Sequence, residues 1–236
     1  MADAPFSSLP LPKDQLDNLI SLGYASMTGI QAASLPLAFK GKDLIAQAKT
    51  GSGKTAAFSL PLLDKLNPRD FGTQALVLCP TRELATQVSG EIRRLARYRQ
   101  NIKVVTLCGG QSIGPQIGSL EHGAHIVVGT PGRISDHLRK KTLNLTRVGT
   151  LVLDEADRML EMGFVEDISS IIEQTPAARQ TLLFSATVPA GIAKLAQDFQ
   201  HDAKRITTQE ERQQHSDIEY RVLVTAPREK ENAIIN

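Results

Sequence analysis

Several residue types that mark common protein classes are scarce in this 236-residue chain. It has no tryptophan, and the aromatic share is only 4%, which excludes the aromatic platform on which sequence-reading single-strand binders stack bases. Its two cysteines, Cys79 and Cys108, each end an apolar run and have no metal-ligand spacing nearby. We therefore expect buried free thiols in a reducing compartment rather than a disulfide.

The balance of charge and the lack of long apolar runs exclude further classes of protein. The 27 basic and 25 acidic residues leave a net charge of +2, so a nucleic-acid site would have to be a local patch rather than a general positive field. No apolar run approaches the length of a membrane span, and residues 1–12 hold no basic segment followed by an apolar one. We expect a monomeric cytoplasmic protein without a membrane partner.

Short apolar runs alternate with amphipathic stretches along most of the chain. The runs are typical of strands buried on both faces, and they lie at Asp43–Ala46, Ala75–Cys79, Lys103–Cys108, Ile126–Gly129, Thr150–Leu153 and Thr181–Phe184. Helices are predicted at Lys13–Leu22, Ile30–Phe39 (broken or begun near Pro36), Thr55–Leu66, Arg82–Arg99, Ser112–Leu120, Arg133–Lys140, Val165–Glu173 and Ala190–Phe199. This alternation predicts an α/β fold, with a mostly parallel sheet, helices on both faces and ligands at the carboxyl edge.

The stretch AKTGSGKT, Ala48 to Thr55, is a candidate phosphate-binding loop. It stands between a predicted strand and a predicted helix, where backbone N–H groups and the helix N-terminus converge on phosphate oxygens. Lys54 would contact the β- and γ-phosphates and Thr55 would hold Mg²⁺. The other expected nucleotide-binding residues of the loop are Thr50, Gly51, Ser52 and Gly53. Ala48 replaces the first glycine of the general pattern, and a glycine-rich turn with a stray lysine is the alternative.

An acidic motif follows the predicted strand Thr150–Leu153. Asp154 would reach the sheet edge, where a phosphate-loop enzyme holds Mg²⁺, and Glu155 beside it can polarise an attacking water. The alternative is an acidic helix N-terminus stabilised by the helix dipole, which suits Asp157 equally well. The candidate catalytic residues are Lys54, Asp154 and Glu155, and the candidate magnesium ligands are Thr55 and Asp154.

Six short motifs follow one another at the predicted strand ends: AKTGSGKT, PTRELA (80–85), GG (109–110), TPGR (130–133), DEAD (154–157) and SAT (185–187). In this order they resemble the N-terminal RecA-like domain of a DEAD-box ATP-dependent RNA helicase, over most of residues 1–208. The resemblance implies a RecA-like P-loop NTPase fold, and ATP hydrolysis with Mg²⁺ that drives local RNA unwinding or RNP remodelling. Ala48 fits the family pattern A-x-x-G-x-G-K-T.

Within that family, LVLCPTRELATQV, IRRLAR, TLCGGQ and RQTLLFSAT look most like the bacterial DbpA branch. That likeness implies a role on ribosomal RNA in large-subunit assembly.

The resemblance also implies an adenine-reading motif. Gln31 corresponds to the family's glutamine, and an amide offers the donor and acceptor that match N7 and N6 of adenine. Gly29 stands where the family has proline. Phe6 occupies the position of an aromatic that stacks on the base, with a hydrophobic tether as the alternative. Tyr24 is a further candidate contact, and packing beneath a glycine helix C-cap is its alternative.

Three motifs combine hydroxyls, open backbone N–H groups and one cation, a composition that suits RNA phosphates and 2′-hydroxyls. We expect sequence-tolerant, salt-dependent RNA binding, with helix capping and turn formation as the alternative. The expected RNA-binding residues are Pro80, Thr81, Arg82, Gly109, Gly110, Thr130, Pro131, Gly132 and Arg133. By resemblance, Asp157, Ser185 and Thr187 couple the nucleotide site to RNA, although Ser185 and Thr187 could simply cap a helix.

The chain divides into four predicted segments. Residues 1–40 hold the adenine motif and N-terminal helices, 41–208 form the RecA-like ATP-binding domain, 209–217 are a polar linker, and 218–236 are the truncated start of a second RecA-like domain. Later family motifs, including an arginine finger, are absent. We expect the ATP- and RNA-binding half of a helicase, whose partners are ATP, RNA and its second domain. A nucleotide-responsive RNA-binding scaffold without catalysis and a DNA translocase are the alternatives.

Overall fold

A seven-stranded sheet forms the centre of the computed structural model, which describes residues 4–208. All its strand pairs are parallel, in the order β3-β4-β2-β5-β6-β1-β7. The strands are β1 (Leu44–Gln47), β2 (Ala75–Leu78), β3 (Val104–Leu107), β4 (Ile126–Gly129), β5 (Thr150–Leu153), β6 (Gln180–Ser185) and β7 (Lys204–Thr207). The predicted α/β fold is confirmed. Strand β7 was not predicted, because only Ile206 in it is buried and no apolar run marks it.

Nine α-helices flank the sheet within residues 4–208. They are α1 (Lys13–Ser21), α2 (Gly29–Phe39), α3 (Lys54–Asp64), α4 (Arg82–Leu95), α5 (Gly114–Glu121), α6 (Pro131–Arg139), α7 (Ala156–Glu161), α8 (Val165–Glu173) and α9 (Ala190–Phe199). The predicted break at Pro36 is wrong, since α2 runs through this residue. Burial of Leu35 and Ala38 against the core compensates the hydrogen bond that proline cannot donate.

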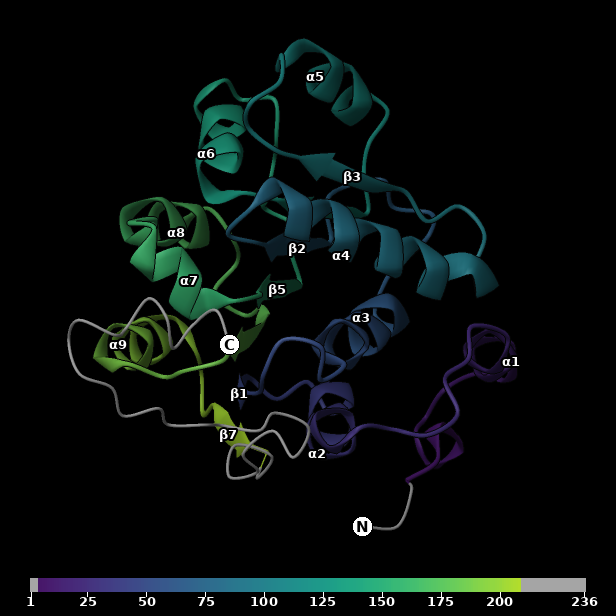
Figure 1. Cartoon of the computed structure of the whole chain (residues 1–236). Helices are drawn as coiled ribbons and strands as arrows, with labels where there is room; N and C mark the ends of the chain where they lie inside the picture. Colours follow the sequence, from purple (N-terminus) through teal and green to yellow (C-terminus); the bar gives the residue numbers. More distant parts are fainter. Residues whose placement is uncertain (1–3, 209–236) are drawn as a thin grey trace, which may run out of the picture.

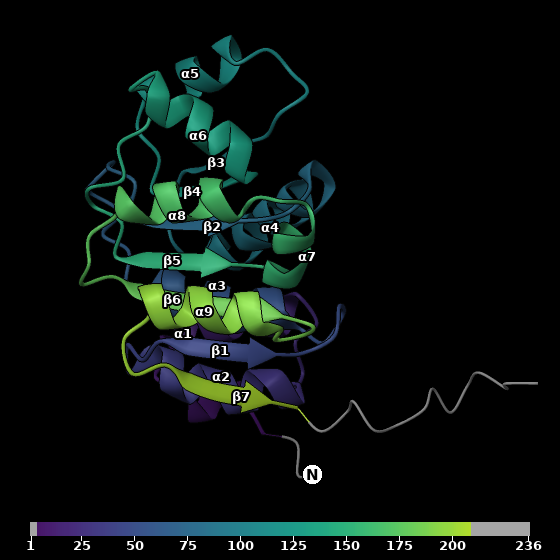
Figure 2. The same ribbon diagram turned by 90° about the vertical axis from the view of Figure 1, so that its left-hand side faces the viewer.

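Alternate residues of strands β1 to β6 face two separate cores, whereas β7 contributes only Ile206 to the first of them. Leu44 and Ala46 of β1 pack with helices α1 to α4, whereas Leu76 and Leu78 of β2 pack with helices α6 to α9. Figures 1 and 2 show these two groups of helices on opposite faces of the sheet. Residues 4–40 share the first core, because Phe6 is buried in it together with helices α1 and α2. The N-terminal region is therefore packed onto the same sheet.

The strand order sorts the sequence motifs along one edge. Because the strands are parallel, all their carboxyl ends lie at the same edge of the sheet. The loops after the neighbouring strands β3, β4 and β2 carry GG, TPGR and PTRELA, and those after β5, β6 and β1 carry DEAD, SAT and the phosphate loop. The expected RNA motifs and the expected nucleotide motifs thus occupy adjoining halves of one edge.

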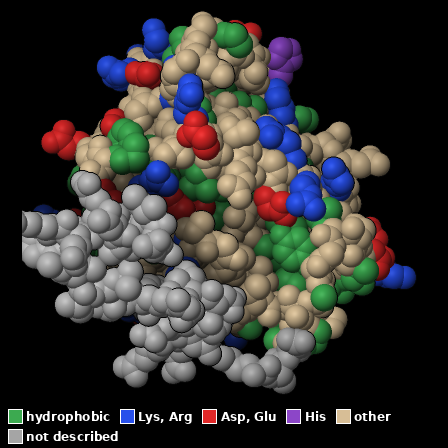
Figure 3. Space-filling model, viewed as in Figure 1, with side chains coloured by type: hydrophobic (Ala, Val, Ile, Leu, Met, Phe, Trp, Pro, Cys, Tyr) green, Lys and Arg blue, Asp and Glu red, His purple; other side chains and the backbone are tan. Residues whose placement is uncertain are grey.

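The distribution of charged side chains on the surface agrees with the nearly equal numbers of basic and acidic residues. On the face drawn in Figure 3, basic and acidic side chains are interspersed rather than gathered in one field.

Cys79 is buried and Cys108 half-buried, both are free thiols, and burial raises the pKa of each. Between residues 4 and 208 no helix is both long and apolar enough to cross a bilayer. The predicted linker and second-domain start, 209–236, lie outside the described residues.

Candidate functional site

The phosphate loop connects β1 to α3, and its geometry depends on two glycines. Gly51 and Gly53 have φ values of +83° and +92°, in the left-handed region that residues with a Cβ rarely adopt. Gly53 is also the N-cap of α3, and a Cβ on it would lie 2.5 Å from Nε2 of Gln31. Helix α3 therefore begins at Lys54 with its first backbone N–H groups at the loop, the arrangement that binds anions.

Lys54 lies inside this loop. Its side chain is almost fully buried, and Nζ donates a hydrogen bond to the carbonyl oxygen of Ala48 at 3.2 Å. Thr55 follows it, half-buried in the first turn of α3. The loop thus brings a cation and a hydroxyl to the place where the sequence predicted phosphate and magnesium contacts.

The acidic motif faces the loop from the end of β5. Asp154 is only 3% exposed, and its Oδ1 accepts a hydrogen bond from the Glu155 backbone N–H at 3.1 Å. Burial raises the pKa of Asp154 to about 6, although the nearby Lys54 ammonium opposes the shift. Glu155 has φ +52°, which is strained for a side chain of this type, and its Oε1 accepts from the Thr50 hydroxyl at 3.2 Å. The two nucleotide motifs are therefore in direct contact.

These donors suit a magnesium ion that is bound together with phosphates. Mg²⁺ is usually held by one or two carboxylates, with phosphate oxygens and waters completing the octahedron. The carboxylate of Asp154 and the hydroxyl of Thr55 form such a set. Residues 4–208 contain no group of three or more His, Cys, Asp or Glu side chains that could hold a metal ion.

Gln31 ties α2 to the phosphate loop. Its Oε1 accepts from the Thr28 backbone N–H at 2.9 Å, and its Nε2 donates to the carbonyl oxygen of Gly53 at 3.0 Å. The Thr28 hydroxyl donates to the Ser52 carbonyl oxygen at 2.7 Å. Thr28 is a site residue that the sequence motifs do not predict, although Thr28 and Gln31 have the Thr-x-x-Gln spacing of a capping box. Gly29, in place of proline, is the first residue of α2, so the turn still enters a helix.

Phe6 and Tyr24 lie beside this region and contact each other. Phe6 is 5% exposed, and its ring meets that of Tyr24 edge-on, with centroids 5.9 Å apart. The Tyr24 hydroxyl donates to Oε1 of Glu91 at 2.7 Å. The burial of Phe6 fits the hydrophobic tether, and stacking on a base stays a prediction for both residues.

The PTRELA and GG motifs meet after β2 and β3. The Thr81 hydroxyl caps α4 by accepting from the Leu84 backbone N–H at 3.3 Å, as the capping alternative expects. Arg82 is half-exposed, and its Nη1 donates to the Gly109 carbonyl oxygen at 3.4 Å. Gly110 has φ +75°, and a Cβ on it would collide with this guanidinium. Arg82 thus combines a structural contact with an accessible cation.

The TPGR motif begins α6, with Thr130 as N-cap and Pro131 as the first helical residue. Gly132 faces open space, since nothing lies within 4 Å of an added Cβ. Arg133 differs from Arg82 because it is only 9% exposed and its Nη2 donates to the Gln111 carbonyl oxygen at 2.8 Å. Among the described residues its Nη1 has no hydrogen-bond partner. Arg133 therefore anchors the loop that follows β3.

A hollow lies against these RNA motifs. It has a volume of about 500 Å³ and borders the loop that follows β3. The lining residues are Arg82, Glu83, Thr86, Thr106, Cys108, Gln111 and Gln116.

The three predicted coupling residues form one hydrogen-bonded cluster between the ends of β5 and β6. The backbone N–H of Asp157 donates to the Ser185 hydroxyl at 3.1 Å, and both N–H and hydroxyl of Thr187 donate to Oδ2 of Asp157 at 2.9 Å. Burial alone would raise the pKa of Asp157, but these hydrogen bonds hold it below its usual value. Asp157 also lies in the first turn of α7, so the dipole alternative applies as well.

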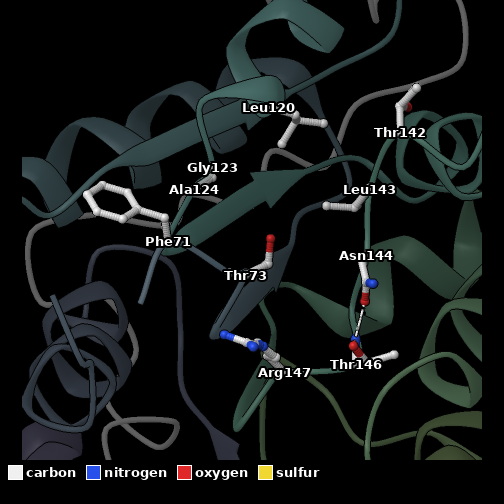
Figure 4. A pocket seen from close by; sticks show the side chains of 11 residues that line it. Phe71, Thr73, Leu120, Gly123, Ala124, Thr142, Leu143, Asn144, Thr146 and Arg147 are labelled. Atoms are coloured by element: carbon white, nitrogen blue, oxygen red, sulfur yellow. Dashed lines mark hydrogen bonds between the residues drawn. The ribbon is translucent and has the colours of Figure 1, made fainter. Parts of the chain in front are cut away.

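A separate cavity of about 240 Å³ opens at the opposite edge of the sheet. Figure 4 shows its lining, which includes Phe71, Thr73, Asn144 and Arg147 from segments that precede β2 and β5. None of the predicted site residues lines it, so the chemistry predicted from the motifs lies at the carboxyl edge.

Comparisons with known proteins find one family and several related sequences. The family model described as DEAD/DEAH box helicase matches residues 28–195. The chain is 59% identical over 198 residues to the ATP-dependent RNA helicase DbpA of Escherichia coli, covering 84% of this chain and 43% of that protein. It is 48% identical over 201 residues to the ATP-dependent RNA helicase CshA of Listeria monocytogenes, covering 85% of this chain and 38% of that protein.

The fold comparison gives a similar result. The crystal structure of a DEAD box protein from the hyperthermophile Methanococcus jannaschii superposes with a TM-score of 0.82 at 43% identity, covering 86% of this chain and 55% of that one. The chain spans less than half the length of the two curated relatives.

Proposed function

Because the chain belongs to the DEAD/DEAH box helicase family, we propose that it is the ATP- and RNA-binding half of an ATP-dependent RNA helicase. The observation that carries this proposal is the sorting of the motifs along one sheet edge. Nucleotide motifs follow β1 and β5, the expected coupling motif SAT follows β6 between them, and RNA motifs follow β2, β3 and β4. The two sets adjoin at β2 and β5. A change at the nucleotide can therefore reach the RNA loops over a short distance.

In the nucleotide half, Lys54 and the first turn of α3 would hold the phosphates, and Thr55 and Asp154 would hold Mg²⁺. Bound magnesium neutralises phosphate charge during transfer. Glu155 would orient the attacking water and accept its proton, and its hydrogen bond with Thr50 fixes the carboxylate at the loop. Gln31 would read adenine by exchanging its hydrogen bonds to Thr28 and Gly53 for the base, which predicts a preference for ATP over GTP.

In the RNA half, Arg82 and the open backbone of Gly109, Gly132 and their neighbours would contact phosphates and 2′-hydroxyls. Such binding is sequence-tolerant and weakens with salt. The cluster of Asp157, Ser185 and Thr187 would couple the nucleotide to RNA, as the family resemblance implies. Its hydrogen bonds join the loop that carries Glu155, next to the RNA loop after β2, to the end of β6.

We propose further that a second RecA-like domain supplies the opposing wall of the site, so that this chain alone binds nucleotide weakly and hydrolyses little ATP. The likeness to the DbpA branch supports ribosomal RNA in large-subunit assembly as the target. Because the RNA contacts proposed for this chain are sequence-tolerant, the target is tested by crosslinking RNA in cells to a longer chain that includes a second RecA-like domain. Enrichment of ribosomal RNA is expected, and its absence would contradict the assignment.

Glu155→Gln separates an enzyme from a scaffold that binds without catalysis. In a chain continued through a second RecA-like domain, we expect ATP binding to persist while turnover falls roughly 10²–10⁴-fold, the usual effect of removing a catalytic base. Glu161→Gln is the matched control, since Glu161 is exposed at the last residue of α7, the helix for which Glu155 is the N-cap. Unchanged turnover in Glu155→Gln would favour the scaffold.

A further inference from the structure

The loop of residues 108–113, which carries Gly109 and Gly110, has little core beneath it. It joins β3, the end strand of the sheet, to α5, a helix in which no residue is buried. Packing alone therefore holds this loop weakly, because local stability follows the number of buried apolar contacts. If the backbone of this loop and the start of α6 both contact RNA, the loop must be held at a fixed distance from α6.

Side-chain hydrogen bonds connect this loop to α6. Nε2 of Gln116, on α5, donates to the carbonyl oxygen of Cys108 at 2.9 Å. Its Oε1 lies 3.3 Å from Nε2 of His137, on α6. Since an amide oxygen only accepts hydrogen bonds, this arrangement assigns the imidazole proton to Nε2. Nδ1 of His137 then accepts the one proton of the Thr142 hydroxyl at 2.8 Å, which makes the longer 3.2 Å contact of this hydroxyl with the His137 carbonyl oxygen secondary.

His137 is fully buried, so both ring nitrogens depend on these partners. Burial and the nearby Arg133 guanidinium lower the pKa of His137, which keeps the ring neutral as the assigned hydrogen bonds require. Arg133 adds a second connection between the same elements through the carbonyl oxygen of Gln111. A polar network therefore holds the loop in place where apolar packing is sparse.

We propose that Gln116 and His137 are positioning residues that fix the GG backbone against the TPGR helix start, so that both bind one RNA strand. The inference rests on the proposed RNA binding of these motifs. Neither side chain needs to touch RNA. Their effect is to hold Gly109 and Thr130 at a spacing that matches the RNA backbone, as supporting residues do in other binding sites.

The test compares Gln116→Leu, which removes both hydrogen bonds at similar volume, with Ser119→Ala. Ser119 is exposed on the same helix, and its hydroxyl donates to the Pro115 carbonyl oxygen within that helix. Fluorescence anisotropy with single-stranded RNA at low salt, affinity for an ATP analogue and thermal unfolding are measured for each. We expect Gln116→Leu to lose RNA affinity roughly tenfold with nucleotide affinity unchanged, and Ser119→Ala to match the wild type.

Two further variants keep the test decisive if Gln116→Leu folds poorly. Gln116→Glu keeps an acceptor for His137 but cannot donate to Cys108, so it should also lose RNA affinity. His137→Leu combined with Gln116→Leu should lose no more than the worse single variant, because the two residues act as one unit.

The outcomes separate the two proposals. A wild-type chain that binds no RNA would refute the proposed function itself. A wild-type chain that binds RNA, with variants that bind equally tightly, would refute the positioning role. Equal losses of RNA and nucleotide affinity would also overturn it, since they would indicate general destabilisation.

Discussion

Replacing Gly53 by alanine tests how the phosphate loop is held by α2. The new Cβ would lie 2.5 Å from Nε2 of Gln31 and 3.0 Å from the Thr28 hydroxyl. A left-handed backbone costs a residue with a Cβ about 1–2 kcal/mol. Gln31 is 1% exposed and cannot swing into solvent, so its displacement would leave buried polar atoms unpaired, at about 1–3 kcal/mol. Together these terms predict a destabilisation of about 2–5 kcal/mol.

Gly51→Ala is the matched control, because Gly51 has a similar φ and nothing within 4 Å of an added Cβ. It should lose only the backbone cost of about 1–2 kcal/mol. Urea unfolding of both variants measures the difference, and Gln31→Ala combined with Gly53→Ala should recover most of the clash energy. Equal destabilisation by the two single variants would refute the claim that Gln31 and the loop are packed together.

Two further predictions concern the acidic loops. Asp154 has a pKa of about 6 in the folded protein against 3.8 in the unfolded chain. Protonated Asp154 therefore contributes fully to the free energy of unfolding below pH 3.8, and this contribution is lost as the pH rises through 6. The free energy of unfolding is measured for Asp154→Asn and for the wild type from about pH 4 to 7. The difference between the two should change in favour of the variant by up to about 3 kcal/mol, and a difference that does not depend on pH would contradict the raised pKa. Thr187→Val removes one of the two hydrogen bonds that Thr187 makes to Asp157. It should reduce RNA-stimulated ATP hydrolysis in a two-domain chain with little change in Tm, and undiminished stimulation would exclude the coupling role.

Local patterns of apolar residues in the sequence predicted most of the helices and strands, but not the order of the strands in the sheet. Continuous apolar runs marked six strands because those strands are buried on both faces, whereas β7 has one buried residue and no such signal. The strand order depends on long-range pairing that periodicity does not encode. Motif spacing therefore predicted which loops would bear the chemistry, while the proposed separation into a nucleotide half and an RNA half required the sheet topology.

The sequence likewise does not predict how deeply a single side chain is buried or which residues it contacts. Arg82 and Arg133 occupy comparable places in their motifs, yet Arg82 is half-exposed and Arg133 is buried against Gln111. The sequence contains no local signal for this difference, because it arises from how the loop after β3 folds over α6. Gln31 was predicted as an adenine reader, and its hydrogen bond to Gly53 became evident only from the packing of α2 on the loop.

RNA-stimulated ATP hydrolysis tests the central claim most directly. It is measured for this chain and for one that continues through a second RecA-like domain, at equal concentrations of protein, ATP, Mg²⁺ and RNA. Because we propose that the opposing wall belongs to the second domain, only the longer chain should respond strongly to RNA. Equal stimulation of both chains would contradict the account.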